Sequence, residues 1–179
     1  MSTTDLIAEN EALVRRVFED VINASDPAAA EEVCSDDLEM HVPGLRLPVG
    51  PDGLRGLAHS LRGGFPDLHV VIDDAIATED GAAVRWHTDR QTHTGEYRGL
   101  PPTGRPVTVT GITFHRIKDR RVTSTWVEAD SLGLGQQLGL VPPDELGSGA
   151  KVRFILGSIF RLAYLQARHS ARSGSRRRA

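Results

Sequence analysis

The chain has 179 residues, of which 39% are hydrophobic and 25% charged, a globular composition that excludes a mostly disordered protein. No stretch approaches the roughly 18 apolar residues of a membrane-spanning helix, and no signal peptide is visible at the N-terminus, so we expect a cytoplasmic protein. A single cysteine, Cys34, excludes a disulfide within the chain.

Charge divides the chain into two regions. Residues 151–179 contain eight Lys and Arg residues and no Asp or Glu, which leaves 13 basic against 24 acidic residues before them, a net charge of -11. Such an asymmetry predicts regions with different roles. We expect one domain over residues 1–143. Residues 144–179 are then a linker, a basic amphipathic helix over residues 151–167 and a disordered Arg-rich tail.

The first third of the chain is predicted to be helical. Residues 5–24 carry an apolar stripe with charged residues opposite it, as in an amphipathic helix. Ser25 or Asp26 is placed to cap a second helix over residues 27–34, and a third is expected over residues 52–61. A short strand over residues 38–42 and a loop rich in proline and glycine lie between them.

The middle of the chain alternates with period two, which predicts strands. The expected strands cover residues 68–77, 82–93, 107–117 and 121–129, and residues 133–143 read as a closing turn. Helices followed by consecutive strands indicate an α+β fold, in which the helices cover one face of a curved antiparallel sheet.

Polar side chains repeat on one face of the strand over residues 82–93. Alternation places Arg85, His87, Asp89, Gln91 and His93 together. This face either lines a cavity, as a hydrogen-bonding wall, or faces solvent, where the row has little meaning.

The last expected strand leads to Asp130, on the same face as Trp126 and Glu128. Asp130 either caps the turn that follows, as aspartate often does, or lies against an apolar wall that raises its pKa by desolvation. In the second case it can exchange a proton with a carbon acid. His115 and His41 are lone strand histidines, which are more often structural or exposed.

Several other chemistries lack their motifs. The seven histidines form no His-x-His or His-Glu-x-x-His pattern, so a zinc site would need distant residues. The nucleophile elbow of hydrolases and the glycine-rich nucleotide fingerprints are also missing. These chemistries are therefore poorly supported by the sequence.

Residues 10–143 carry motifs that resemble one family. These are the opening helix over residues 10–23, Phe65-Pro66-Asp67-Leu68, Thr92-His93-Thr94-Gly95-Glu96, Gly99, Pro101-Pro102-Thr103-Gly104-Arg105, Trp126 with Asp130, and Gln137-Leu138-Gly139. Together they resemble the SnoaL-like polyketide cyclases of the nuclear transport factor 2-like superfamily. One departure is Asp119-Arg120-Arg121-Val122, where the family usually has Asp-Gly-Lys-Ile, and this changes the turn.

The resemblance implies a fold, a reaction and a set of residues. The fold is a cone-shaped α+β barrel, with a bent antiparallel sheet wrapped around the N-terminal helices, often in a homodimer, and we expect a homodimer or a higher homo-oligomer. The reaction is a cofactor-independent intramolecular aldol condensation of a small hydrophobic polyketide-like substrate, as in antibiotic biosynthesis. Asp130 takes the acid/base position and His115 assists. The expected substrate-binding residues are Trp126, His93, His87, Gln91, Asp89, Phe18 and His41. For His93 the resemblance implies either a place in the pocket or a role in anchoring the hairpin.

Other functions on this fold stay open. An epoxide hydrolase would place Asp89, with Arg85 or Arg90, opposite Asp130, and a ketosteroid isomerase-like enzyme would shuttle a proton. A non-catalytic domain would only bind a hydrophobic ligand. The C-terminal helix either docks on the domain or on its partner, or lies on an anionic membrane surface. No nucleic-acid partner is expected.

Overall fold

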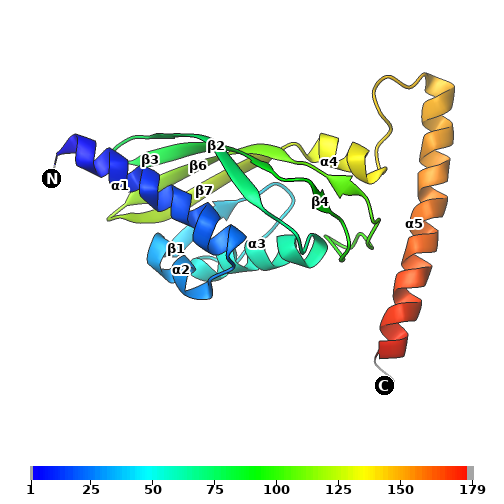
Figure 1. Cartoon of the computed structure of the whole chain (residues 1–179), viewed down its shortest axis with the longest axis horizontal. Helices are drawn as coiled ribbons and strands as arrows, with labels where there is room; N and C mark the ends of the chain where they lie inside the picture. The colour runs from blue at the N-terminus through cyan, green and yellow to red at the C-terminus, as the bar shows by residue number, and fades with distance from the viewer. Residues whose placement is uncertain (1, 177–179) are drawn as a thin grey trace.

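The structure, a computed structural model, describes residues 2–176, with side chains described as far as His169. Helices α1 (Thr3–Arg16), α2 (Pro27–Val33) and α3 (Pro51–Gly64) pack with a five-stranded sheet. Figure 1 shows α2 and α3 below the sheet and a long C-terminal helix apart from it. Of the described residues, none belongs to a helix that is both long and apolar enough to cross a membrane.

The opening helix forms because both its ends and its apolar face are satisfied. Ser2 and Asp5 form a capping box at its start. After α1 the chain continues as the π-helix η1 (Val17–Asn23). The predicted apolar stripe is confirmed. Its buried members are Val14, Val17, Phe18, Val21 and Ile22.

The sheet has the order β1–β7–β6–β3–β2. Its strands are β1 (Cys34–His41), β2 (Val70–Ala77), β3 (Gly81–Thr88), β6 (Thr110–Lys118) and β7 (Arg121–Ala129). β1 pairs parallel to β7 and the other pairs are antiparallel. The sheet is curved and unclosed, and it confirms the predicted α+β fold with helices covering one face.

The expected strands over residues 82–93 and 107–117 are both interrupted, and each forms two strands of the structure. In the first, β3 ends at Thr88, and a bend at Asp89 and Arg90 separates it from β4 (Gln91–Thr92). β4 pairs with β5 (Pro106–Val107), which precedes the second interruption. Trp86 and Thr88 are buried before the bend, whereas Gln91 and His93 are buried after it. The bend therefore exchanges the two faces of the strand, and the predicted five-residue polar row does not exist.

The C-terminal region is more helical than the sequence indicated. Residues 131–138 form helix α4 (Ser131–Leu138), where a turn was expected. Helix α5 (Ser148–Arg176) begins before residue 151 and continues past residue 167, so the expected disorder from Arg168 is wrong as far as Arg176. Alanine and arginine are strong helix formers, which favours this continuation. The rest of the predicted tail, residues 177–179, lies outside the described residues.

Candidate functional site

A cavity of about 360 Å³ lies between the inner face of the sheet and the helices η1, α3 and α4. Its wall is predominantly apolar. The helices contribute mainly Phe18, Ile22, Leu54, Leu57, Leu61, Leu134 and Leu138, and the strands contribute Trp86, Thr88, Thr113, His115, Thr125, Val127 and Ala129. A volume above about 300 Å³ with few polar groups is typical of a small-molecule site.

His115 is the buried titratable group of this cavity. It projects from β6 and is 1% exposed. Its Nδ1 lies 3.0 Å from Oγ1 of Thr125, and its Nε2 has no hydrogen-bond partner among the described residues. Burial lowers the pKa of His115 to about 4, so its ring is neutral at pH 7. Nε2 is therefore the ring atom left free to bond a molecule in the cavity.

Gln91 supplies a second unpaired polar atom. Its amide Nε2 donates to Oγ1 of Thr88 at 3.2 Å, while its Oε1 has no partner within the described part of the chain. Both residues line the cavity. Buried polar atoms are nearly always bonded, so the free atoms of Gln91 and His115 indicate a place for a polar ligand group.

Asp130 lies at the edge of the cavity. Its carboxylate is open to solvent, whereas we expected it to be buried against an apolar wall. Its side chain is exposed, and its Oδ1 accepts a hydrogen bond from the backbone N–H of Gly133 at 2.7 Å. The reason is local. β7 ends at Ala129, and Asp130 is the N-cap of α4, so its side chain no longer follows the strand alternation. Trp126 and Asp130 therefore do not share a face.

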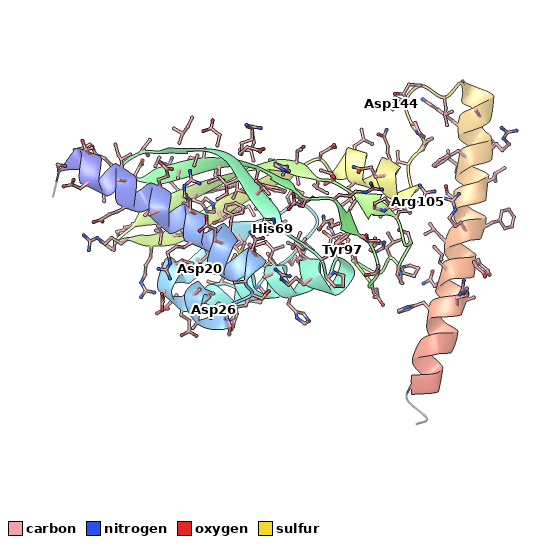
Figure 2. The ribbon with its side chains drawn as sticks, viewed as in Figure 1. Asp20, Asp26, His69, Tyr97, Arg105 and Asp144 are labelled. Atoms are coloured by element: carbon pink, nitrogen blue, oxygen red, sulfur yellow. The ribbon has the colours of Figure 1, made fainter. Side chains whose placement is uncertain are left out.

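Two loops border the cavity, and no sequence pattern points to Arg98, the residue that joins them. Arg98 has a φ of 52° and its Nη2 donates to the carbonyl of Pro43 at 3.2 Å. Tyr97, beside it, also lines the cavity and lies at the end of the domain that faces α5 (Figure 2). Trp86 also lines the cavity, and the sequence does not point to it, because the polar side chains of its strand lie on the opposite face.

Trp126 and His41 lie outside the cavity. Their rings stack at 4.9 Å, with Trp126 39% exposed, and Phe114 packs beside Trp126. Trp126 alternates with Thr125 and Val127, which face the cavity, so it occupies the outer face of the sheet. The expected role of both residues in substrate binding is not supported by this placement.

His87 and Asp89 also lie away from the cavity. His87 pairs with Asp73 at 2.7 Å, and Asp89 pairs with His69 at 2.8 Å. Arg85 contacts Asp73 as well. The Asp-Arg-Asp set of the epoxide hydrolase alternative is therefore not assembled, because the bend after Thr88 leaves Asp89 on the surface.

His93 has a structural position. It is fully buried, its ring packs 5.1 Å from that of Phe65, and its Nδ1 accepts a hydrogen bond from the backbone N–H of Thr103. Burial lowers its pKa. It does not line the cavity, and its contacts anchor the loop that leads to β5.

The site thus brings together three of the predicted residues in one wall, with Asp130 at the border. The three are His115, Gln91 and Phe18. Among the described residues, no group of three or more His, Cys, Asp or Glu side chains is placed to hold a metal ion. A neutral imidazole and a carboxylate beside an apolar volume can support proton transfer on an uncharged carbonyl compound.

Comparisons with known proteins agree with this geometry. TsrD from Streptomyces laurentii is 25% identical, with a TM-score of 0.67 over 75% of this chain and 97% of that one. IdmH from Streptomyces antibioticus, assigned as a polyketide cyclase, is 29% identical, with a TM-score of 0.61 over 72% and 96%. AclR from Streptomyces galilaeus, assigned as a hydroxylase, is 26% identical, with a TM-score of 0.64 over 76% and 99%.

No match was found among curated proteins. The family profile of the SnoaL-like polyketide cyclases matches residues 12–138, which include every strand of the sheet and the cavity-lining helices η1, α3 and α4. The chain belongs to the SnoaL-like polyketide cyclase family.

Proposed function

We propose that the chain closes a ring in a polyketide-derived substrate by intramolecular aldol condensation, without a cofactor. The observation that carries this proposal is the free Nε2 of His115, buried in an apolar cavity that has Asp130 at its border. The assignment of IdmH as a polyketide cyclase supports the same reaction class.

The reaction begins with proton transfer from carbon. The Asp130 carboxylate removes a proton alpha to one carbonyl, and the resulting enolate attacks a second carbonyl carbon of the same molecule. A carbon–carbon bond forms, the second carbonyl becomes an alkoxide, and Asp130 returns the proton to it. Substrate that fills the cavity covers the exposed carboxylate, and this strengthens its interaction with the reacting atoms.

His115 stabilises the developing negative charge in this scheme. With Nδ1 accepting from the Thr125 hydroxyl, the proton of the neutral ring sits on Nε2 and donates to the carbonyl oxygen. A preorganised donor of this kind contributes about 3 kcal/mol in other enzymes. Positioning a flexible substrate inside the apolar wall adds the larger share, roughly 7–11 kcal/mol in ideal cases.

Binding without turnover is the second candidate function. It is favoured by one observation, namely that Asp130 is exposed and already bonded to Gly133 as a helix cap. In that case the cavity holds a hydrophobic ligand, and Asp130 has a structural role only.

The experiment that separates these functions is an Asp130→Asn substitution. Asparagine caps a helix as well as aspartate does, so the fold of α4 is kept while the base is lost. The full chain is incubated with a panel of polyketide esters that carry a second carbonyl, and ring products are measured by mass spectrometry. We expect the variant to be slower by about 100-fold or more.

Asp144→Asn is the matched control, because Asp144 is exposed on the connector before α5 (Figure 2). It should keep the wild-type rate. Full activity of Asp130→Asn would show that Asp130 is not the acid/base. Ligand retention by the wild-type protein, with no product from any ester, would favour binding alone.

A further inference from the structure

Helix α5 contacts the domain through one of its faces. Ser158, 5% exposed, donates its Oγ hydrogen to the carbonyl of Gly139 at 2.9 Å, and His169 lies 3.4 Å from a carboxylate oxygen of Glu96. The side chains that share this face are at least partly buried. They are Lys151, Phe154, Ser158, Leu162, Leu165 and His169.

Another side of α5 carries a continuous apolar stripe that the described part of the chain leaves exposed. We define the α5 stripe as Val152, Ile155, Leu156, Ile159 and Phe160, whose spacing of three and four residues places them along one side of a helix. Each is exposed, from 46% for Ile155 to 75% for Phe160. An exposed apolar surface of this extent marks an interaction site.

Positive charge accompanies the α5 stripe. Helical spacing places Arg153 and Arg168 along the edge of the stripe that carries Phe160. The guanidinium of Arg168 packs over the Tyr164 ring, 5.6 Å from its centroid. No Asp or Glu occurs after Glu145, so no acidic side chain within the helix offsets these charges. An apolar face bordered by arginines is the pattern of a helix that lies in a membrane interface.

We propose that α5 binds the surface of an anionic membrane, with the α5 stripe in the acyl-chain boundary and its arginines at lipid phosphates. The charge of the helix is complementary to such a surface, and each arginine near it adds attraction. This inference does not depend on the proposed reaction.

The observations favour a membrane over a second copy of α5. Two α5 helices paired through their stripes would bring two sets of arginines together without an acidic residue on either helix, and like charges in contact are destabilising. A lipid surface receives the same apolar side chains and supplies the missing negative charge.

Binding at this place would hold the cavity close to lipid. The two contacts of α5, at Gly139 and Glu96, adjoin cavity-lining residues, namely Leu138 and Leu140 at the first and Tyr97 at the second. A helix with its side chains is about 10–12 Å across, so the border of the cavity would lie within one helix diameter of the bilayer.

The test is co-sedimentation of the full chain with vesicles of phosphatidylcholine alone or mixed equally with phosphatidylglycerol. We expect the chain to pellet with the mixed vesicles, less at high salt. Ile159→Gln should weaken partitioning about tenfold. Ile76→Gln, the same change at an exposed position on β2, should have no effect. Arg153→Gln and Arg168→Gln should each weaken it about fivefold.

Three outcomes would overturn the proposal. One is a failure of the vesicle test itself, seen either as no pelleting with mixed vesicles or as pelleting that Ile159→Gln leaves unchanged while circular dichroism shows the same helix content. Another is a dimer in solution that Ile159→Gln converts to a monomer without any vesicle binding, which would assign the stripe to a second copy. The third is binding of duplex DNA but not of vesicles.

Discussion

His115 combines complete burial with one bonded and one free ring nitrogen. Desolvation keeps the ring neutral, because a charged imidazolium in an apolar cavity loses its hydration without a carboxylate partner. A neutral ring can donate a hydrogen bond to a carbonyl oxygen without adding a net charge to the cavity. The same burial makes His115 a pH-dependent element of stability.

The pH dependence of unfolding measures that burial. The pKa of His115 is about 4 in the folded chain against 6.5 for a free histidine, so the unfolded chain binds the proton first as the pH falls. The free energy of unfolding should therefore drop between pH 6.5 and pH 4, with a contribution from His115 of about 3 kcal/mol. In His115→Gln that contribution should be missing.

Urea titrations at a series of pH values check this prediction. His59→Gln is the control, since His59 is exposed and the same substitution there should keep the wild-type profile. Parallel curves for the wild type and His115→Gln would contradict the burial of a neutral ring. His93, whose pKa burial also lowers, is present in all three proteins and does not affect the comparison.

Among the secondary-structure elements, two features explain why strand alternation did not predict which side chains face the cavity. A bend at Asp89 and Arg90 exchanged the faces of one expected strand, and the end of β7 released Asp130 from the pattern of Trp126. Alternation is a property of continuous strand, and a sequence does not show where pairing partners stop. Helix α4 was missed because its glycines resemble a turn, although Asp130 is a good N-cap.

The turn between β6 and β7 carries backbone strain. Asp119 and Arg120 both have positive φ, at 51° and 60°, and neither is glycine. The left-handed region disfavours other residues by about 1–2 kcal/mol, and Asp-Gly is a preferred pair for a two-residue turn of this type. Arginine at position 120, where the family usually has glycine, is therefore expected to lower the free energy of unfolding.

Replacement of Arg120 separates strain from charge. Arg120→Gly and Arg120→Ala both remove the ion pair with Glu9, whose oxygen lies 3.0 Å from Nε. Only glycine relieves the backbone, so we expect Arg120→Gly to be more stable than Arg120→Ala by about 1 kcal/mol in urea unfolding. Equal stability of the two variants would show that this turn is not strained.

For the whole molecule, the α+β class, the apolar face of the opening helix and the family were predictable from residue patterns. These depend on local periodicity and on motifs that are contiguous in sequence. The cavity was less predictable, because its wall joins η1, α3 and α4 with residues from strands that are distant in sequence and that only the sheet order brings together. The homodimer and the cytoplasmic location stay predictions.

The proposed reaction depends on one step, in which a proton leaves carbon inside this cavity under the control of Asp130. It is tested by deuterium exchange on a polyketide ester analogue with a single carbonyl, which cannot close a ring. Nuclear magnetic resonance follows the loss of the proton at the alpha position in D₂O. Quenching of Trp86 fluorescence, measured in a Trp126→Phe background, shows that the analogue is bound. Trp86 is then the remaining tryptophan of the chain and it lines the cavity.

We predict enzyme-dependent exchange that Asp130→Asn slows by about 100-fold and Asp144→Asn leaves unchanged. A bound analogue that exchanges no faster than it does in buffer would show that this cavity does not remove a proton from carbon.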